Sequence, residues 1–465
     1  MVRQVLVFRV PITIYSWFCN IPMFVCVFEW LFRGDCVKAR VVVEDVSDIR
    51  GSLFRVFDAF GGVEEFIKSD SKVFIKYNGV HFGKEMYTDP RVIGEIVSIA
   101  RSITRDKVYV MENSTQSNFT RMVAEVSGIA KVVKQNGGRN LYLDEQRHVM
   151  VEFGDERIPT KFPKILYDNL IREKGNNVLI NIPKLKTHWM TTVTLGIKCF
   201  QGILYDSDKM VNHNYKLHQK LVDNVKFLRP DFTIIEGINA LKFGHFPPQK
   251  LLPECVVPMN ILVASDDVVA CDVVGAKILG YDIDEVEHIR LAAEQGLGVG
   301  NLKDIEIIGD ISRFKERFPI TPCRECPSDI RLIKGKEMAC VEGCYGNTML
   351  ALLYLWYDFD GAGGFNVIVG KGVEENELDD LLPGDILIVG PCTVEENLDR
   401  VRKKYPDRKI YTINECNDIA KITTYLGKLM KIKTLKMIPL SPLKALGIVI
   451  QAKLHGLDAN IPPIL

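Results

Sequence analysis

The sequence lacks a net charge, because 59 lysines and arginines are balanced by 59 aspartates and glutamates over 465 residues. Basic stripes with interleaved aromatic residues, internal repeats and low-complexity segments are missing as well. A chain without excess positive charge has no overall field that attracts nucleic acid. The composition is therefore that of a globular protein, and nucleic-acid binding is not expected.

The sequence also lacks the evenly spread cysteines of a small disulfide-bonded secreted domain, although it contains 12 cysteines. Four of them lie close together as Cys323-x2-Cys326 and Cys340-x3-Cys344. A Cys-x2-Cys pair lets two thiolates hold one metal from a tight turn, and two such pairs supply four soft ligands. The spacing predicts a zinc site or an iron–sulfur cluster in a reducing, cytoplasmic environment.

A second grouping of the cysteines stays open. Cys392 and Cys416 end two predicted parallel strands and are expected at the same sheet edge. They form an alternative quartet with Cys340 and Cys344, which leaves the Cys-x2-Cys pair as a redox or partial site. The six cysteines favour an iron–sulfur cluster of the 4Fe-4S type over zinc, and a cluster implies a redox partner protein.

Residues 10–28 form a stretch without a charged side chain. Its length just suffices to span a bilayer, but Pro11, Pro22 and Asn20 argue against a spanning helix. Three interpretations are open for residues 1–36: an artefact of the start site or a disordered extension, a membrane anchor, or a packed pair of strands. The expected location is cytoplasmic, with anchoring through residues 10–28 as the alternative.

From Val37 onward, short apolar runs rich in valine and isoleucine alternate with amphipathic stretches. The runs are continuously apolar, which is typical of a mostly parallel sheet covered by helices. The sequence therefore predicts an α/β domain over residues 37–318. Strand-like runs and an amphipathic helix recur after it, so a smaller, cysteine-rich α/β domain is predicted over residues 319–465.

Several predicted strands end in polar residues. Open parallel sheets bind ligands beyond the carboxyl ends of their strands, so these residues are expected to converge if the strands share one sheet. The residues at these strand ends are Lys76, Asn78, Glu112, Asn113, Lys184, Lys186, Thr187, His188 and Glu236.

The run KLKTH at residues 184–188, followed by Lys198, predicts an electropositive pocket for a carboxylate or a phosphate. His188 is expected to titrate near neutrality as a general acid or base. The structural alternative is a rim of solvated lysines beside a loop histidine whose hydrogen bonds are satisfied. The substrate-binding set predicted here includes Lys76 and Asn78 as well.

Two further segments supply candidates. His213 follows a loop and is preferred as a substrate-binding residue over His218, because five positions do not place two ligands on one helical face. Asp267 follows an apolar strand and either caps the next helix or binds substrate. Asp272 falls among apolar neighbours within that helix, so its carboxylate is expected to meet a cation, in a salt bridge or in an active site.

The stretch VLINIPKLKTHWMTTVTLGIKCFQGIL resembles the domain-of-unknown-function family 362 (DUF362), whose members carry a Pro-Lys-x-Lys-Thr-His run followed by Thr-x-x-x-Lys and a glycine. VFIKYN, HNYKLHQ and SDDVVACDVVGAKILGYD resemble further motifs of that family, in the same order. The resemblance covers roughly Lys72 to Asp310. Tyr77 replaces the family's usual proline, and the ferredoxin-like cysteine repeats of many members are absent, so electron transfer does not carry over by resemblance.

A more distant similarity is to the lactate racemases. In that family a histidine stands ten residues before the lysine that anchors a nickel-pincer cofactor, and a nickel-ligating histidine follows. His188 and Lys198 show the same ten-residue spacing, Gly202 follows, and His213 lies near the third position. The tripeptide LGI at residues 195–197 stands where racemases have Gly-Gly.

Three functions are therefore expected as alternatives. The first is an iron–sulfur or metal-binding enzyme that acts on an anionic small molecule, with His188, Lys198 and Asp272 as catalytic residues. The second is a zinc-stabilised protein that binds an anion or an acidic segment of a partner without catalysis. The third is a racemase-like enzyme with a cofactor attached to Lys198.

Overall fold

The computed structural model describes residues 39–115, 118–209 and 213–457. The uncharged stretch at residues 10–28, with its three interpretations, lies outside these residues. Within them, no helix combines the length and the apolar character that crossing a bilayer requires. From Ala39 onward the chain forms one compact unit.

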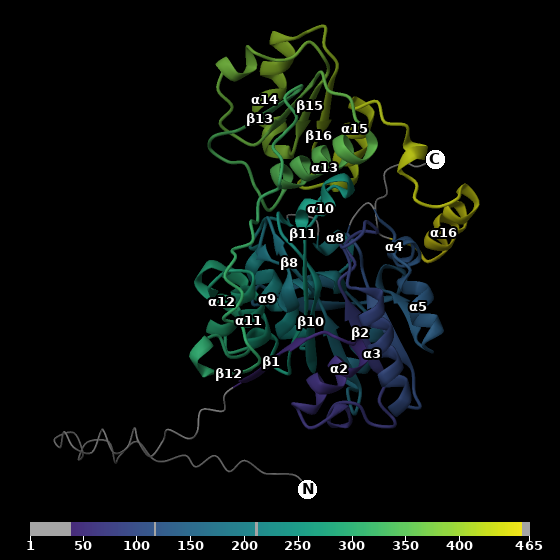
Figure 1. Ribbon diagram of the computed structural model, residues 1–465. Coiled ribbons are helices and arrows are strands. Elements are labelled where there is room, and N and C mark those ends of the chain that lie inside the picture. The colour runs from purple at the N-terminus through teal and green to yellow at the C-terminus, as the bar shows by residue number, and fades with distance from the viewer. Residues whose placement is uncertain (1–38, 116–117, 210–212, 458–465) are drawn as a thin grey trace, which may run out of the picture. The chain divides into compact units, whose positions relative to one another are not determined.

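Ten strands of the described chain form the main sheet (Figure 1). They are β1 (Ala39–Asp45), β2 (Val73–Tyr77), β3 (Val108–Glu112), β4 (Arg139–Tyr142), β7 (Val178–Ile182), β8 (Lys184–His188), β9 (Thr192–Val193), β10 (Phe232–Leu241), β11 (Val256–Ser265) and β12 (Ile305–Ile308). The order is β12-β1-β11-β10-β7-β2-β3-β4, and β8 pairs with β10 and β9. Most pairs are parallel, while β1–β11, β10–β11 and β8–β9 are antiparallel. The predicted α/β class with a mostly parallel sheet is confirmed.

Helices cover both faces of this sheet (Figure 1). Ile234 and Ile235, adjacent on β10, belong to separate apolar cores on the two faces, because successive strand side chains point to opposite sides. Burial on both faces explains why the apolar runs are continuous. The helices of one face are α2 (Ile49–Asp58), α3 (Pro90–Ile103) and α5 (Ile129–Gln135), and those of the other are α7 (Leu195–Cys199), α9 (Leu217–Phe227), α11 (Val268–Ile278) and α12 (Glu287–Glu294).

Local sequence signals start several of these helices. The Asp48 side chain accepts a hydrogen bond from Gly51 N at the start of α2. Asp89 does the same for Arg91 N in α3, whose first residue is Pro90. Aspartate at the cap satisfies an N–H group that has no partner within the helix, and proline fits the first helical position without losing a hydrogen bond.

The KLKTH run is itself a strand, β8, and not the loop after one. Pro183 separates it from β7, and β10 pairs in parallel first with β7 and then with β8. The register places Lys184 opposite Glu236. All five side chains of the run are buried, so its charges are enclosed in the protein and do not form a solvated rim.

A second sheet, of four parallel strands, follows in the described chain, in the order β13-β14-β15-β16. One of its faces shares an apolar core with α13 and α15, and the other packs against α14. This arrangement is α/β, as predicted for residues 319–465, while its standing as a separate cysteine-rich domain stays a prediction. The elements are β13 (Ile330–Lys334), α13 (Cys344–Phe359), β14 (Phe365–Val369), β15 (Ile386–Val389), α14 (Pro391–Lys404), β16 (Ile410–Ile413) and α15 (Ile419–Leu429).

The remaining elements are a hairpin and short or peripheral helices. The hairpin strands pair antiparallel, and the last helix contacts the helix at residues 120–126. These elements are β5 (His148–Phe153), β6 (Ile158–Pro163), α4 (Thr120–Val126), α6 (Lys164–Leu166), α8 (Asp206–Lys209), α10 (Leu252–Cys255) and α16 (Pro442–Leu454).

Candidate functional site

A cavity of about 100 Å³ lies beyond the carboxyl ends of β2, β3 and β8, beside α7. This is the position at which open α/β sheets bind ligands. Four of the predicted site residues line it, namely Asn78, His188, Lys198 and His213. We call it the cationic cavity.

Lys198 reaches the cationic cavity from α7. The start of α7 is held by Asp272 of α11, whose carboxylate accepts hydrogen bonds from Gly196 N at 2.6 Å and Ile197 N at 2.8 Å. Burial raises the pKa of Asp272 to about 7. Asp272 was expected to meet a cation, but its described hydrogen-bond partners are two backbone amides. It positions the helix that carries Lys198 and is not part of the described cavity lining.

The chain from β9 into the first residue of α7 has a strained backbone. Thr192 and Leu195 have φ angles of 63° and 37°, in the left-handed region that residues other than glycine rarely adopt. Strain of this kind costs on the order of 1–3 kcal/mol per residue and concentrates at functional sites. The surrounding β8–β9 pairing and the Asp272 contacts hold this segment in place.

Lys198 has no counterion within the described residues, since none of their carboxylates forms an ion pair with its Nζ. Burial and the nearby charge of Lys209 lower its pKa to about 8. Lys209 also lines the cavity, but it is bound: its Nζ contacts Asp206 Oδ1 at 3.0 Å and donates to Ser114 O at 2.6 Å. Lys198 is therefore the cation of this cavity that is free to meet a ligand.

Three imidazoles surround the same cavity. The rings of His188 and His245 stack with centroids 3.6 Å apart and an interplanar angle of 2°. Met190 N donates to Nδ1 of His188 at 3.1 Å, and Nδ1 of His213 donates to Glu342 O. Burial, His245 and Lys198 lower the pKa of His188 well below its ordinary value. The expectation that His188 titrates near neutrality is therefore wrong, because a buried imidazole beside two lysines stays neutral.

Three polar atoms around the cavity are buried and have no hydrogen-bond partner among the described residues. They are Asn78 Oδ1, Thr194 Oγ1 and His245 Nδ1, and all three residues line the cavity. Buried polar atoms in folded proteins are almost always paired. Their unused capacity indicates a polar ligand or ordered water at this place.

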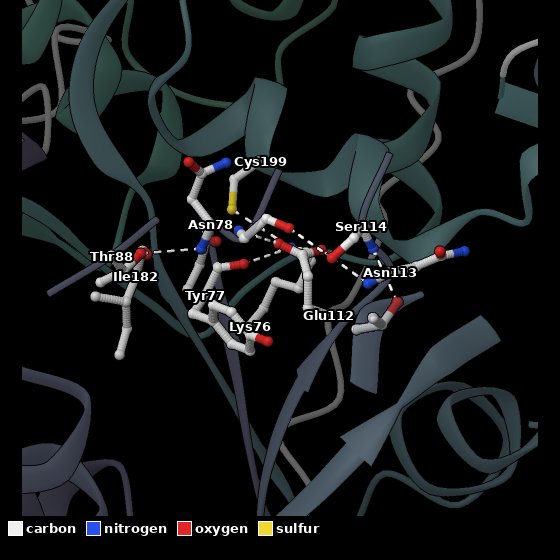
Figure 2. Close-up of polar contacts among 12 residues, drawn as sticks. Lys76, Tyr77, Asn78, Thr88, Glu112, Asn113, Ser114, Ile182 and Cys199 are labelled. Carbon is white, nitrogen blue, oxygen red and sulfur yellow. Dashed lines mark hydrogen bonds and ion pairs between the residues drawn. The ribbon is translucent and has the colours of Figure 1, made fainter. Parts of the chain in front are cut away.

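Lys76 and Glu112 form a buried ion pair beside the cavity, with Nζ and Oε1 2.6 Å apart (Figure 2). Lys76 Nζ also lies 3.6 Å from the Cys199 sulfur and donates to Tyr77 O. Burial opposes the charge of Lys76, but Cys199 and Glu112 outweigh it and raise its pKa. A β-carbon at Gly202 would collide with Glu112 Oε1, so glycine is needed at that position.

Lys184 forms a second buried ion pair, away from the cavity lining. Its Nζ lies 3.0 Å from Glu236 and 2.9 Å from Glu85, and these carboxylates raise its pKa against the effect of burial. Lys186, two residues on, has no hydrogen-bond partner among the described residues. Burial and Lys184 lower the pKa of Lys186 to about 7. Neither lysine is among the described residues that line the cavity, although both were predicted to bind substrate.

The other two predicted substrate-binding residues have structural contacts. Thr187 donates to Pro319 O at 3.0 Å and accepts from Gly244 N. Asp267 caps α11, as the capping alternative predicts: Oδ1 accepts from Val269 N, and Oδ2 accepts from Val299 N. Neither residue is among the described lining residues.

The lining residues that the sequence reasoning missed include Cys199, Lys209 and His245. Cys199 directly follows Lys198, and burial raises the pKa of its thiol to about 11. His245 comes just after β10, so a search for histidines beyond strand ends finds it. Lys209 carries no such signal, because it lies at the end of the short helix α8 and does not follow a predicted strand.

The four cysteines of the alternative grouping lie near one another. Asn214 bridges two members, since its Nδ2 donates to Cys340 Sγ and its Oδ1 accepts from Cys416 Sγ, both at 3.4 Å. Cys344 forms a hydrogen bond with Cys416, which raises the pKa of Cys344 and lowers that of Cys416 to about 7. Cys392, at the start of α14, is close enough to act electrostatically on Cys340. We call these four the cysteine quartet.

The two cysteines of the Cys-x2-Cys pair, Cys323 and Cys326, contact groups outside the quartet. The sulfur of Cys323 is 3.7 Å from that of Cys255, and Cys326 donates to Ile330 O at 3.8 Å. As they stand, no group of three or more His, Cys, Asp or Glu side chains in the described part of the chain is arranged to hold a metal ion. Metal binding at either cysteine set stays a prediction.

Residues 73–277 match the family model described as Domain of unknown function (DUF362), which confirms the predicted resemblance over this part of the chain. The chain is also 26% identical over 268 residues to the thylakoid-associated protein sll1697 of Synechocystis sp., an alignment that covers 55% of this chain and 77% of that protein. The cationic cavity takes most of its lining from the matched region. The similarity to lactate racemases stays a prediction.

Proposed function

We propose that this DUF362 chain is an enzyme that holds an anionic small molecule against Lys198. The observation that carries the proposal is the unpaired cation, because Lys198 lines a cavity and has no counterion among the described residues. Buried charges are costly unless paired, so a cation kept free at a cavity is suited to a charge on a ligand. The unpartnered Asn78, Thr194 and His245 atoms supply further polar contacts.

Lys198 is also the group best placed for acid–base work. Its pKa of about 8 lies close to neutral pH, where both the ammonium and the amine are populated. The imidazoles of His188 and His245 are neutral and stacked, so they orient a ligand by hydrogen bonding and do not supply charge.

The binding half of this proposal is tested with inorganic phosphate and acetate as probes. Isothermal titration calorimetry on the wild-type chain, Lys198→Met and Lys186→Met compares a lining lysine with a buried lysine that is not among the described lining residues. Binding that is lost in Lys198→Met and retained in Lys186→Met supports the proposal. Equal binding by all three proteins would overturn it.

The catalytic half is tested by a turnover screen. Organic anions are incubated with the protein, and products are detected by mass spectrometry. Turnover that disappears in Lys198→Met supports an enzyme, whereas binding without any turnover favours the anion-binding protein without catalysis.

We extend the proposal to a metal or an iron–sulfur cluster at the cysteine quartet. The Asn214 bridge and the Cys344–Cys416 hydrogen bond already bring these thiols together at the carboxyl ends of β15 and β16 and the start of α13. Thiolates are the ligands of both zinc and iron–sulfur clusters. Binding requires the four sulfurs to draw closer, since the described side chains do not yet form a metal-holding group.

Anaerobic purification followed by iron, sulfide and zinc analysis tests this extension. Cys344→Ser with Cys416→Ser is expected to remove the metal, whereas the matched control Cys323→Ser with Cys326→Ser retains it. Stoichiometric zinc without sulfide would favour the zinc-stabilised protein. Metal loss in the control alone would move the site to the Cys-x2-Cys pair.

One observation favours a second candidate, a cofactor attached to Lys198. His188 and Lys198, which have the ten-residue spacing of the lactate racemases, line one cavity with His213, which lies near the third position. Intact-mass analysis of protein from its native source is expected to show an adduct that maps to Lys198. An unmodified mass would contradict this candidate and leave the anion site unaffected.

A further inference from the structure

A second cavity, of about 130 Å³, adjoins the cationic cavity. The two have shared lining residues, which are Val80, Thr115, His245, Asn347 and Ile419. Residues that line both spaces form the boundary between them. The two cavities are therefore direct neighbours.

The second cavity is apolar. Its lining includes Phe82, Met122, Leu350 and a pair of aromatic rings, Phe246 and Tyr354, whose centroids lie 5.3 Å apart at an interplanar angle of 67°. No Lys, Arg, Asp or Glu is among its described lining residues. We call it the apolar cavity, and its surface favours a group that gains by leaving water.

The size of the apolar cavity limits what it holds. An apolar cavity of about 150 Å³ in a protein interior accommodates one benzene molecule. At about 130 Å³ this cavity is suited to one aromatic ring or a branched alkyl group of similar size. The cationic cavity, at about 100 Å³, leaves room beside it for a small charged head group.

The boundary between the cavities carries no charge of its own. His245 stacks on His188 there, and burial lowers the pKa of His245 well below its ordinary value. The flat faces of two neutral imidazoles are compatible with an aromatic ring, and the unpartnered Nδ1 of His245 can bond a polar atom next to that ring. The lining thus changes from charged in the cationic cavity to neutral polar at the boundary and apolar in the apolar cavity.

We infer that the substrate is an amphipathic organic anion, with a carboxylate or phosphate at Lys198 and an apolar body of about one ring in the apolar cavity. This inference rests on the proposed anion site. It adds the chemical class of the substrate, which the charge of Lys198 alone does not determine.

The experiment compares matched pairs of probes on the wild-type chain: acetate with benzoate, and inorganic phosphate with phenyl phosphate. Burying a ring-sized apolar group contributes about 1.5–3 kcal/mol, so each aromatic probe is expected to bind at least about tenfold more tightly than its partner. The carboxylate and phosphate pairs together show which head group the cationic cavity prefers.

A filling variant, Ala351→Leu, adds volume from α13 into the apolar cavity. It is expected to abolish the advantage of benzoate while leaving the affinity for acetate unchanged, and the retained acetate binding serves as its own control for folding. If this variant fails to fold, the comparison of acetate with benzoate on the wild-type chain still tests the inference.

Two outcomes separate the inference from the function on which it rests. Equal affinities for acetate and benzoate, both dependent on Lys198, would overturn the amphipathic substrate and leave the anion site standing. Absence of binding by all four probes would overturn both.

Discussion

Two groups of lysines, one of which includes the partly exposed Lys198, lie near the same end of the main sheet and differ in how their charges are compensated. Lys76 and Lys184 each contact a buried carboxylate, Glu112 and Glu236, and their pKa values are raised. Lys186 and Lys198 form no ion pair within the described residues, and their pKa values are lowered to about 7 and about 8. We call them the paired and the unpaired lysines.

The difference teaches which charges serve the fold and which are available for chemistry. A buried pair costs more to break than it contributes when intact, so the paired lysines hold the sheet end together. An unpaired lysine destabilises the fold by itself and is expected where function requires it. Of the two unpaired lysines, Lys198 lines the cationic cavity, so the comparison singles it out.

The largest expected effect comes from breaking a pair. Glu236→Leu leaves the buried ammonium of Lys184 with only the partly exposed Glu85, and removal of one partner of a buried pair typically costs about 3–5 kcal/mol. Denaturant unfolding measures the loss. Addition of Lys184→Met to Glu236→Leu is expected to restore much of the stability, whereas additive losses in the double variant would show that the pair is not coupled.

The next largest effect is expected on ligand binding and not on stability, when an unpaired lysine is replaced. Lys198→Met removes the free cation, and a hydrogen bond to a charged group is worth about 1.5–3 kcal/mol, so phosphate affinity is expected to fall by about 10- to 100-fold. The unfolding free energy is expected to stay the same or to rise, because a desolvated charge is gone. A Lys198→Met protein that unfolds as readily as Glu236→Leu would contradict the distinction between paired and unpaired lysines.

The pH dependence of stability sharpens the comparison at Lys186. Its folded-state pKa of about 7 lies below the ordinary lysine value of 10.5, so between these two pH values the unfolded chain binds a proton that the folded chain does not. The unfolding free energy therefore rises with pH across this window, by up to about 1.4 kcal/mol per pH unit. The unfolding free energies of wild type and Lys186→Met, measured with denaturant, are expected to become equal as pH rises from 7 to 10.5. Parallel curves would mean that Lys186 is paired in solution.

The smallest effect is the pH dependence of anion binding near neutrality. Lys198 holds its proton below a pKa of about 8, so phenyl phosphate affinity is expected to be flat there apart from the probe's own ionisation, and to fall at higher pH as the ammonium is lost. Benzoate, which stays ionised throughout, provides the matched probe. Lys198→Arg keeps the positive charge, so the decrease in affinity is expected to occur at higher pH in this variant. A decrease at the same pH would show that another group titrates.

Much of the fold was predictable from the sequence because its signals are local. Continuous apolar runs marked β2, β3, β7 and β10, and aspartate and proline marked the start of α3. KLKTH was expected to lie beyond a strand, but it is β8, because pairing with β10 overrides the appearance of a charged turn. Lys184 is tolerated in this buried strand because Glu236 lies opposite it, and the two residues are far apart in the sequence.

The candidate site was predictable in part. Asn78, His188, Lys198 and His213 were expected and do line one cavity, while Lys184 and Thr187 were expected and make structural contacts instead. The roles assigned to the site residues changed more than the set of residues that line the cavity. His188 was assigned the titration near neutrality, but burial and neighbouring cations hold it neutral, and burial cannot be read from residue type.

The sequence by itself determined the α/β class, the match to the DUF362 family model over residues 73–277 and the concentration of basic residues around Lys184 to Lys198. Periodicity and motif order depend on residues that are close together in the chain, so both can be recognised from the sequence alone. Only the tertiary structure decided which lysines have carboxylate partners, which cysteines approach one another and where an apolar cavity adjoins a cationic one. These depend on side chains far apart in the chain, whose distances and desolvation are set only when the sheet and its helices pack together.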